Sequence, residues 1–471
     1  MTSGLGRPRI TTKLAFGLGS TAESIATAAI AGFAMFFYNQ VLGLPATLAG
    51  AAMTAGIAFD GIVDPLIGSI SDRTRSRLGR RHPFLLAAPV PVALCLFALF
   101  NPPNGLPPLA LFAWFLGVVV ALRIAMSVFG VPHMALGGEL STDYTERTRV
   151  MSYSNFMGAI GTTATAFVAL SVFFRATPEH PRGILNPAGY ESLSLVAPLA
   201  CLALYALCAG LTARQIPRLA QPPIGAARFR PGDFLADVRA AFSNRNYLFL
   251  LLAVFFLALM GGMRTALSLY VNTFFWGLTS EQIRWFAFTN LVGFFVAFML
   301  AGRLHNRFDK RASMVVCALL VGVVPAMPVL VQMAGWAPPS GSAALVVMLM
   351  ASGAVYSAVA AVLAISVLSA LGDIADENQL RYGIRQEGVL FSTRAVFAKV
   401  DSALGAFCAG LAIDLVGLPA KAIPGQVAAH IPLELALIEG PLGVVPALIA
   451  AWFYGRYAID RRSHAETRRQ L

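Results

Sequence analysis

Long apolar runs alternate with short polar segments along the whole chain. Each run has roughly 18 residues or more, which is enough for one α-helix to cross the ~30 Å hydrocarbon core of a bilayer. The pattern predicts twelve membrane-spanning helices, at about residues 14–40, 46–70, 83–101, 108–136, 150–174, 193–213, 246–276, 281–302, 312–334, 341–371, 388–416 and 432–455. The predicted fold class is therefore an all-α polytopic membrane protein.

The composition agrees with this prediction. Of the 471 residues, 57% are hydrophobic and 12% are charged, and the mean hydropathy is +0.70, which excludes an ordinary soluble protein. The net charge of +12 could suggest a nucleic-acid partner, but the charges lie in short loops between the apolar runs, where they set membrane orientation. We expect a lipid bilayer and a small-molecule substrate as partners, and no nucleic acid.

Lysine and arginine residues are divided unequally between the two sets of loops. Of 35 such residues, 27 belong to the two ends of the chain and the loops expected on their side, and the opposite loops hold four: Arg175, Arg182, Arg284 and Lys421. Because cytoplasmic loops hold the excess of positive charge, both termini are predicted to be cytoplasmic and the protein to reside in the cell membrane. An odd number of spans would mix the two sets, so the bias also supports twelve.

A proline-containing linker divides the chain into two halves of six spans each. We predict a first bundle over residues 1–213, a cytoplasmic linker over 214–245, a second bundle over 246–456 and a cytoplasmic tail over 457–471. The second part of the linker, 233–242, has the pattern of a short amphipathic helix on the membrane surface.

The two halves contain a repeated turn. Gly68-Ser-Ile-Ser-Asp72-Arg73 follows the second span, and Gly302-Arg-Leu-His-Asn-Arg307 follows the eighth. The two glycines are 234 residues apart, about half of the chain. A duplicated six-helix half is typical of secondary transporters, which bind their solute near the bilayer midplane.

The second span contains two carboxylates inside an apolar helix. Asp60 and Asp64 are four residues apart and therefore share one helix face. A charge at bilayer depth costs several kcal/mol, so an intramembrane acid is a functional hypothesis by default. A pair of acids suggests a site for a proton or a small cation, although they could also be structural ion-pair partners.

The sequence gives no support for an enzyme. It lacks Gly-Lys-Ser/Thr, so no Walker-type loop predicts ATP as the energy source. The five cysteines lie in apolar runs without metal-site spacing. We therefore expect no catalytic residues, no resident metal and no cofactor.

Three stretches of the chain together resemble the glycoside–pentoside–hexuronide:cation symporters of the major facilitator superfamily, the family of the melibiose carrier. They are Phe59–Gly68 with Arg75–Phe84, Val131–Arg149, and Asp373–Gly388 with Lys399. The resemblance spans both halves and implies two pseudo-symmetric six-helix bundles that move solute by alternating access.

The resemblance also implies a cation site. Asp60 and Asp64 match the two carboxylates of helix two, and Ser127 matches a hydroxyl of helix four that completes the site. Lys399 matches a lysine of helix eleven that pairs with the helix-two acids.

Three positions depart from the family pattern. Val63 replaces an asparagine of the sodium site, Gly130 replaces a sugar-binding aspartate, and Asn155 replaces an arginine of helix five. Melibiose as a substrate therefore does not carry over. Sodium needs several oxygen ligands and a proton needs one basic carboxylate, so the loss of the amide favours coupling to H+, with Na+ as the alternative.

Other polar residues inside the spans are candidates for substrate binding. Arg123 could bind an anionic group of the substrate, or pair with Asp60 or Glu23. The full set of substrate-binding candidates is Glu23, Arg123, Gly130, Asn155, Arg264, Tyr270 and Asn272.

Charged residues in the predicted cytoplasmic turns are interpreted as gating ion pairs. They are Asp72, Arg73, Glu139, Asp143, Arg147, Arg149, Asp373, Asp376, Arg385 and Glu387.

We conclude from the sequence that the protein imports a sugar- or glycoside-like solute with H+ or Na+ and acts as a monomer. The alternatives are a lysolipid or lipid transporter, or a proton-coupled transporter of drugs or organic anions on the same scaffold.

Overall fold

The computed structural model describes residues 7–141, 143–219, 242–307, 309–382, 387–459, 466–467 and 469–470. The described residues form helices and connecting loops, with no strand among them. The chain divides into two compact units, residues 1–229 and 230–471, and the division falls inside the predicted linker. Residues 220–241, which include most of the predicted amphipathic segment, lie outside the described residues.

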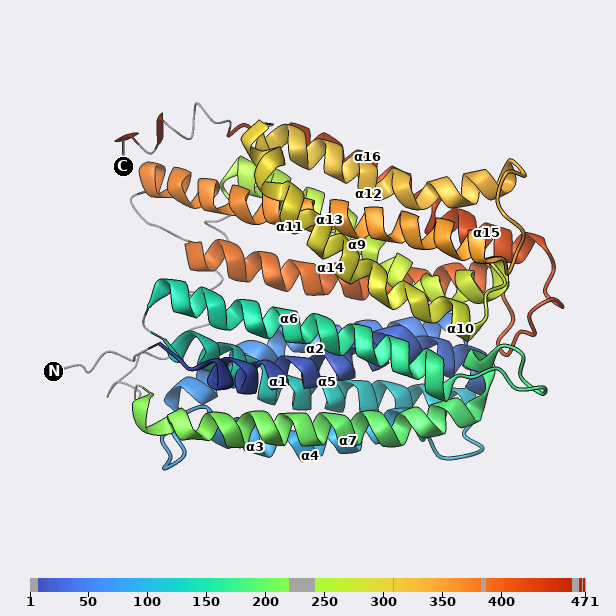
Figure 1. Cartoon of the computed structure of the whole chain (residues 1–471), viewed down its shortest axis with the longest axis horizontal. Helices are drawn as coiled ribbons and strands as arrows, with labels where there is room; N and C mark the ends of the chain where they lie inside the picture. The colour runs from blue at the N-terminus through green and yellow to red at the C-terminus, as the bar shows by residue number, and fades with distance from the viewer. Residues whose placement is uncertain are drawn as a thin grey trace. The chain divides into compact units, whose positions relative to one another are not determined.

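Unit 1 contains the first six spans, which run alongside one another (Figure 1). Its main helices are α1 (Ile10–Ala29), α2 (Ala46–Arg73), α3 (His82–Ala87), α4 (Pro89–Phe100), α5 (Pro108–Glu139), α6 (Tyr144–Val168) and α7 (Pro187–Thr212). π-helical turns extend α1 through η1 (Ile30–Ala34) and η2 (Phe37–Leu42), and extend α6 through η3 (Ala169–Phe173).

Unit 2 contains the other six spans. Its helices are α9 (Arg245–Tyr270), α10 (Ser280–Ile283), α11 (Thr289–Arg307), α12 (Lys310–Met333), α13 (Ala343–Tyr382), α14 (Glu387–Val416), α15 (His430–Glu439) and α16 (Val444–Gly455). A π-helical turn, η6 (Val271–Phe275), extends α9, and 3-10 turns lie at η7 (Arg284–Phe288) and η8 (Pro441–Gly443).

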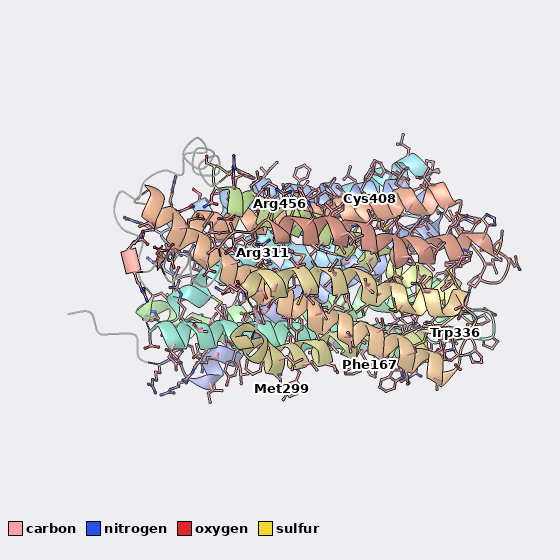
Figure 2. All side chains as sticks on the ribbon, turned by 90° about the horizontal axis from the view of Figure 1, so that it is seen from above. Phe167, Met299, Arg311, Trp336, Cys408 and Arg456 are labelled. Atoms are coloured by element: carbon pink, nitrogen blue, oxygen red, sulfur yellow. The ribbon has the colours of Figure 1, made fainter. Side chains whose placement is uncertain are left out.

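Eleven spans among the described residues are long and apolar enough to cross a membrane. The remaining predicted span corresponds to α14, which has 30 residues but contains several charged side chains, Lys399 and Asp401 among them. Large apolar side chains face outward, as a lipid environment requires: Phe298 is 84% exposed, Met299 51% and Trp336 82%, the last two at the periphery of unit 2 in Figure 2. The twelve-helix prediction is confirmed.

The two units pack their helices in the same pattern. In unit 1, α1 packs against α6 and α7, α5 packs against α2 and α4, and α4 packs against α7. In unit 2, α9 packs against α14 and α16, α13 packs against α11 and α12, and α12 packs against α16. Each contact in one list has its counterpart at the same helix position in the other. The six-helix half that the repeated turn predicts is therefore duplicated in the fold.

Glycines allow close helix contacts at equivalent places in both units. A Cβ built on Gly161 of α6 would lie 2.8 Å from the backbone oxygen of Thr21 on α1. A Cβ on Gly405 of α14 would lie 2.5 Å from the backbone oxygen of Leu259 on α9. Small residues permit such backbone contact between membrane helices, where van der Waals packing drives association.

Three predicted boundaries differ from the structure. The span predicted at 83–101 is two helices, α3 and α4, because Pro89 at the start of α4 has no N–H to continue the ladder. Helix α6 begins before the predicted residue 150, because Asp143 caps it. Helix α13 continues past the predicted end at residue 371.

Candidate functional site

A cluster of charged side chains lies inside unit 1, on α1, α2 and α5. Nη1 of Arg123 lies 3.5 Å from Oδ2 of Asp60, and these side chains are 14% and 7% exposed. Asp64 and Glu23 also lie close enough to act electrostatically on the Arg123 guanidinium. Of the two alternatives for Arg123, the structure therefore shows pairing with Asp60.

The helix geometry explains why these groups meet. Asp60 and Asp64 stand one turn apart on α2, and α2 packs along α5, which contributes Arg123. Gly56, one turn before Asp60, leaves room for Val119 and Arg123 of α5. Three carboxylates therefore act electrostatically on the guanidinium of Arg123.

The other two residues of the predicted cation site lie on α5 and α14. Ser127 is buried on α5, one turn after Arg123. Lys399 lies on α14 of unit 2, where it is exposed. Its pairing with the helix-two acids stays a prediction.

A polar cavity of about 400 Å³ lies in unit 1 between α1, α5 and α6. Three of the predicted substrate-binding residues line it together: Glu23, Gly130 and Asn155. Hydroxyl groups of Ser20, Ser24 and Ser154 face the same space, and the Ser20 and Ser154 hydroxyls contact each other. Carboxylate, amide and hydroxyl groups around one cavity are a set suited to the hydroxyls of a sugar.

Gly130 and Glu23 are directly related in this cavity. A Cβ on Gly130 would lie only 3.1 Å from Oε1 of Glu23. The carboxylate of Glu23 thus lies next to the position where the family pattern has an aspartate. Sequence comparison missed this relation because the two residues are on different helices, and only packing brings them together.

His133 also lines this cavity, but its ring is engaged in packing. Its Nε2 lies 2.9 Å from the backbone oxygen of Phe16, and its ring stacks on the Phe16 ring at 4.1 Å between centroids.

Unit 2 contains a separate polar cavity of about 170 Å³. Arg264 and Asn272, both predicted substrate-binding residues, line it, whereas Tyr270 is fully buried and is absent from its lining. Nε of Arg264 pairs with Oε1 of Glu439 at 3.3 Å. The sequence analysis missed Glu439, although a glutamate followed by Gly440-Pro441 inside an apolar run could have indicated a broken helix.

Two predicted gating residues of unit 1, Asp72 and Glu139, form an ion-pair cluster with Arg80 and Arg81 at one end of the unit. Nη2 of Arg81, at the start of α3, lies 2.5 Å from Oδ1 of Asp72 and 2.8 Å from Oε1 of Glu139. Arg80 also pairs with Glu139, at 2.9 Å. The partner of Asp72 is thus Arg81, and the cluster joins the ends of α2 and α5 to the start of α3.

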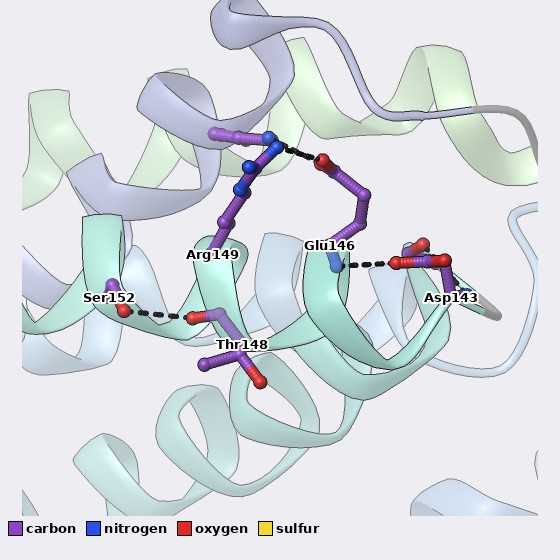
Figure 3. A network of polar contacts seen from close by, with 7 residues as sticks. Asp143, Glu146, Thr148, Arg149 and Ser152 are labelled. Carbon is purple, nitrogen blue, oxygen red and sulfur yellow. Dashed lines mark hydrogen bonds and ion pairs between the residues drawn. The ribbon is translucent and has the colours of Figure 1, made fainter.

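A second network holds the start of α6 (Figure 3). The Asp143 carboxylate accepts a hydrogen bond from the backbone N–H of Glu146 at 2.8 Å and caps the helix. The Glu146 carboxylate receives Lys13 of α1 and Arg149, each at 2.6 Å. Arg147 packs against Gly138 of α5. The predicted turn residues Asp143 and Arg149 are therefore a helix cap and a helix side chain.

Unit 2 has an ion pair equivalent to Arg81–Glu139. Nζ of Lys310, at the start of α12, lies 2.7 Å from Oδ2 of Asp373 near the end of α13. One turn on, Glu377 accepts hydrogen bonds from Asn244 and Asn246 at 3.0 and 3.1 Å.

The remaining gating predictions are located as follows. Asp373, Asp376 and Glu377 lie in α13 and not in a turn, because that helix continues past its predicted end at residue 371 to Tyr382. Arg73 ends α2. Arg385 and the side chain of Glu387 lie outside the described residues. The contacts described here hold helices within one unit, and gating stays a prediction.

Comparison with known proteins agrees with this architecture. The family model described as "MFS/sugar transport protein" matches residues 15–461. An uncharacterised symporter of Synechocystis sp. is 28% identical, over 98% of this chain and 96% of that protein. The lactose permease of Lactobacillus delbrueckii subsp. bulgaricus is 24% identical, over 87% of this chain and 63% of the permease.

A solved structure of a D-xylose–proton symporter has the same fold, with a TM-score of 0.66 and 14% identity over 96% of this chain and 98% of that one. Two six-helix units with the same packing pattern, and charged side chains inside the spans, are typical of a membrane transporter of the major facilitator superfamily. The chain belongs to the MFS/sugar transport protein family.

Proposed function

We propose that this protein is a secondary active symporter that moves a neutral, glycoside-like solute together with a proton. The observation on which the proposal rests is the unit 1 cavity, where Glu23, Gly130 and Asn155 meet. Glu23 also acts electrostatically on Arg123, the partner of Asp60. The family description, MFS/sugar transport protein, and the name of one relative, a lactose permease, support a sugar-type solute, and the name of the Synechocystis relative supports symport.

The charge of the cluster favours a neutral solute. Glu23, Asp60 and Asp64 all act electrostatically on the Arg123 guanidinium, and Asp60 already pairs with it. Several carboxylates together repel an organic anion, whereas their oxygen atoms can accept hydrogen bonds from sugar hydroxyls. This argues against the organic-anion alternative, and the hydroxyl-lined cavity argues against a lipid tail.

The same cluster supports a proton as the coupling ion. Sodium must replace its water by several oxygen ligands, but Asp60 is engaged by Arg123 and Val63 offers only methyl groups. Binding and release of a proton require only one carboxylate. We assign the exchangeable proton to Asp64, with Ser127 and Lys399 as further members of the coupling site.

The proposal places the chain in the cell membrane, with both termini cytoplasmic, as a functional monomer. The 27 to 4 distribution of lysine and arginine between the two sets of loops supports this orientation.

Transport into vesicles tests the proposal. Counterflow with a panel of neutral sugars, methyl glycosides, glucuronides and lysolipids identifies the solute. With that solute, an imposed pH gradient without sodium should drive uphill uptake, and a sodium gradient at equal pH should not. Asp64→Asn should abolish accumulation while counterflow persists, and Val63→Asn should raise any response to sodium. Uptake driven by sodium alone would reject proton coupling, and counterflow with lysolipids alone would reject the solute class.

A further inference from the structure

The cavity of unit 2 is polar and small, and residues of five spans line it. Its lining combines Arg264 and Glu439 with the amides of Asn272 and Asn290 and the aromatic rings of Trp276 and Tyr356. The volume of about 170 Å³ is suitable for one small solute. Every residue of this lining belongs to unit 2, and none of them lines the cavity that contains Glu23.

Three of the surrounding spans lose their regular helical geometry at this cavity. The last span of unit 2 is interrupted between α15 and α16: Gly440 has φ −100° and ψ −89°, directly after Glu439. The equivalent span of unit 1, α7, continues without a break. Helix α9 ends in the π-helical turn η6, which contains Asn272. Broken membrane helices occur where the backbone lines a binding site.

The third irregular span is α12, which contains Pro325 and Pro328. Because Pro328 has no N–H, the backbone oxygen of Val324 loses its helical donor. The Ser352 hydroxyl of α13 donates to this oxygen instead, at 3.1 Å. Pro325, Pro328 and Ser352 all line the cavity. The Ser352 hydroxyl thus replaces, next to the cavity, the hydrogen-bond donor that α12 lacks at Pro328.

The Arg264 guanidinium is fixed in place but only partly satisfied. Glu439 accepts from its Nε side, at 3.3 Å between Nε and Oε1, and the Tyr356 ring lies 4.3 Å from its central carbon. Its Nη1 is buried and has no hydrogen-bond acceptor among the described residues. A buried donor without an acceptor is unfavourable, and an oxygen atom of a bound solute would satisfy it.

We propose that this cavity is a second solute-binding site, which takes one neutral polyhydroxylated molecule with a single sugar ring. Arg264 Nη1 donates to a ring hydroxyl, the Asn272 and Asn290 amides pair with others, and Trp276 covers the apolar face of the ring. Glu439 is a positioning residue that neutralises and orients the guanidinium, and this selects a neutral solute over a sugar acid. The inference shares the solute class of the proposed function but rests on a separate cavity.

Equilibrium dialysis of the full chain in nanodiscs tests the inference. The probes are radiolabelled D-glucose, D-galactose, D-xylose and methyl glucoside, with glucuronate as the anionic comparator. We expect two molecules of one neutral probe per chain at saturation. Arg264→Lys keeps the charge but loses the planar fork, and should weaken one of the two sites at least tenfold. Asn272→Leu fills the same cavity without altering the ion pair and should have the same effect.

Matched variants separate this site from the one in unit 1. Asn155→Trp, in the unit 1 cavity, should remove the other bound molecule and leave the Arg264 site intact. Arg284→Lys, outside both cavities, should leave two molecules bound. Glu439→Gln leaves an uncompensated guanidinium, and should shift the preference of the unit 2 site from the neutral probe to glucuronate.

The outcomes are distinguishable. Suppose that the wild type binds one molecule per chain, and that Arg264→Lys loses it whereas Asn155→Trp keeps it. This result would support the unit 2 site and reject the site of the proposed function. One molecule that is lost only in Asn155→Trp, or no binding of any neutral probe, would overturn the inference. Melting curves of each variant identify any loss of binding that results from unfolding.

Discussion

Glu23 on α1 and Gly130 on α5 are neighbours in the unit 1 cavity. A Cβ built on Gly130 would lie 3.1 Å from Oε1 of Glu23. The carboxylate reaches the cavity from α1 and lies next to the α5 position where the family pattern has an aspartate. The chemical group required by a hydroxyl-bearing solute can therefore be supplied from either helix, provided that the other helix leaves room for it.

Substitutions at these two positions test their relation. Glu23→Ala should weaken solute binding by ten- to a hundredfold, because hydrogen bonds to a charged group contribute about 1.5–3 kcal/mol. The double variant Glu23→Ala with Gly130→Asp should recover most of this loss. Gly130→Ala should reduce binding, whereas Gly117→Ala on the same helix, with nothing within 4 Å, should not. Counterflow rates report the outcome, and a double variant as weak as Glu23→Ala would contradict the relation.

Asp401 on α14 is a buried acid without a described role. Its side chain is fully buried, and neither carboxylate oxygen has a hydrogen-bond donor among the described residues. An ionised carboxylate in this position would cost several kcal/mol, so we expect the neutral acid.

Asp401→Asn should therefore leave the melting temperature within about 2 °C of the wild type, since a shift of 1 kcal/mol corresponds to roughly 2–4 °C in a domain of this size. Asp414→Asn, at an exposed position of the same helix, is the control. A decrease of roughly 8 °C or more for Asp401→Asn alone would show that the ionised form stabilises the fold.

At the scale of the helices, glycines let neighbouring helices pack closely in each unit. Gly405 brings α14 against α9 as Gly161 brings α6 against α1. Gly405→Leu should force the helices apart, at a cost of about 1–3 kcal/mol for overpacking, and lower the melting temperature by roughly 3–10 °C. Gly372→Leu, on α13 with nothing within 4 Å, should have a much smaller effect. Equal melting temperatures of the two variants would show that this contact does not limit stability.

The sequence predicted the helices better than their ends and contacts. Hydropathy and charge located every span, because each must be long, apolar and correctly oriented. The early start of α6 depends on the Asp143 cap and the Lys13–Glu146 pair, and the latter joins residues 133 positions apart. Apolar periodicity does not contain such information.

The candidate sites show the same limit. Asp60 and Asp64 stood out because acids are rare inside a membrane helix. Arg264 also stood out, but its pairing with Glu439 did not, because only the packing of α15 against α9 brings these two side chains together.

At the scale of the whole molecule, the orientation predicted from charge can be measured. Single cysteines at the exposed positions Thr177 and Ser340 should react with an impermeant thiol reagent added outside intact cells. A cysteine at Ser76, which is equally exposed but belongs to the arginine-rich turn after α2, should react only after permeabilisation. The opposite pattern at either set would overturn the assignment of both termini to the cytoplasm.

The duplicated packing pattern has a consequence for biosynthesis. Each unit joins its first and last helices, α1 with α7 and α9 with α16, so unit 1 has all of its own helix contacts before residue 230 is translated. At roughly 5–20 residues per second, synthesis of the 242 residues of unit 2 takes about 12–50 s, far longer than helix association requires. Unit 1 can therefore fold in the membrane while unit 2 is still being synthesised. Two separately translated halves, co-expressed from two genes, should then assemble into an active transporter.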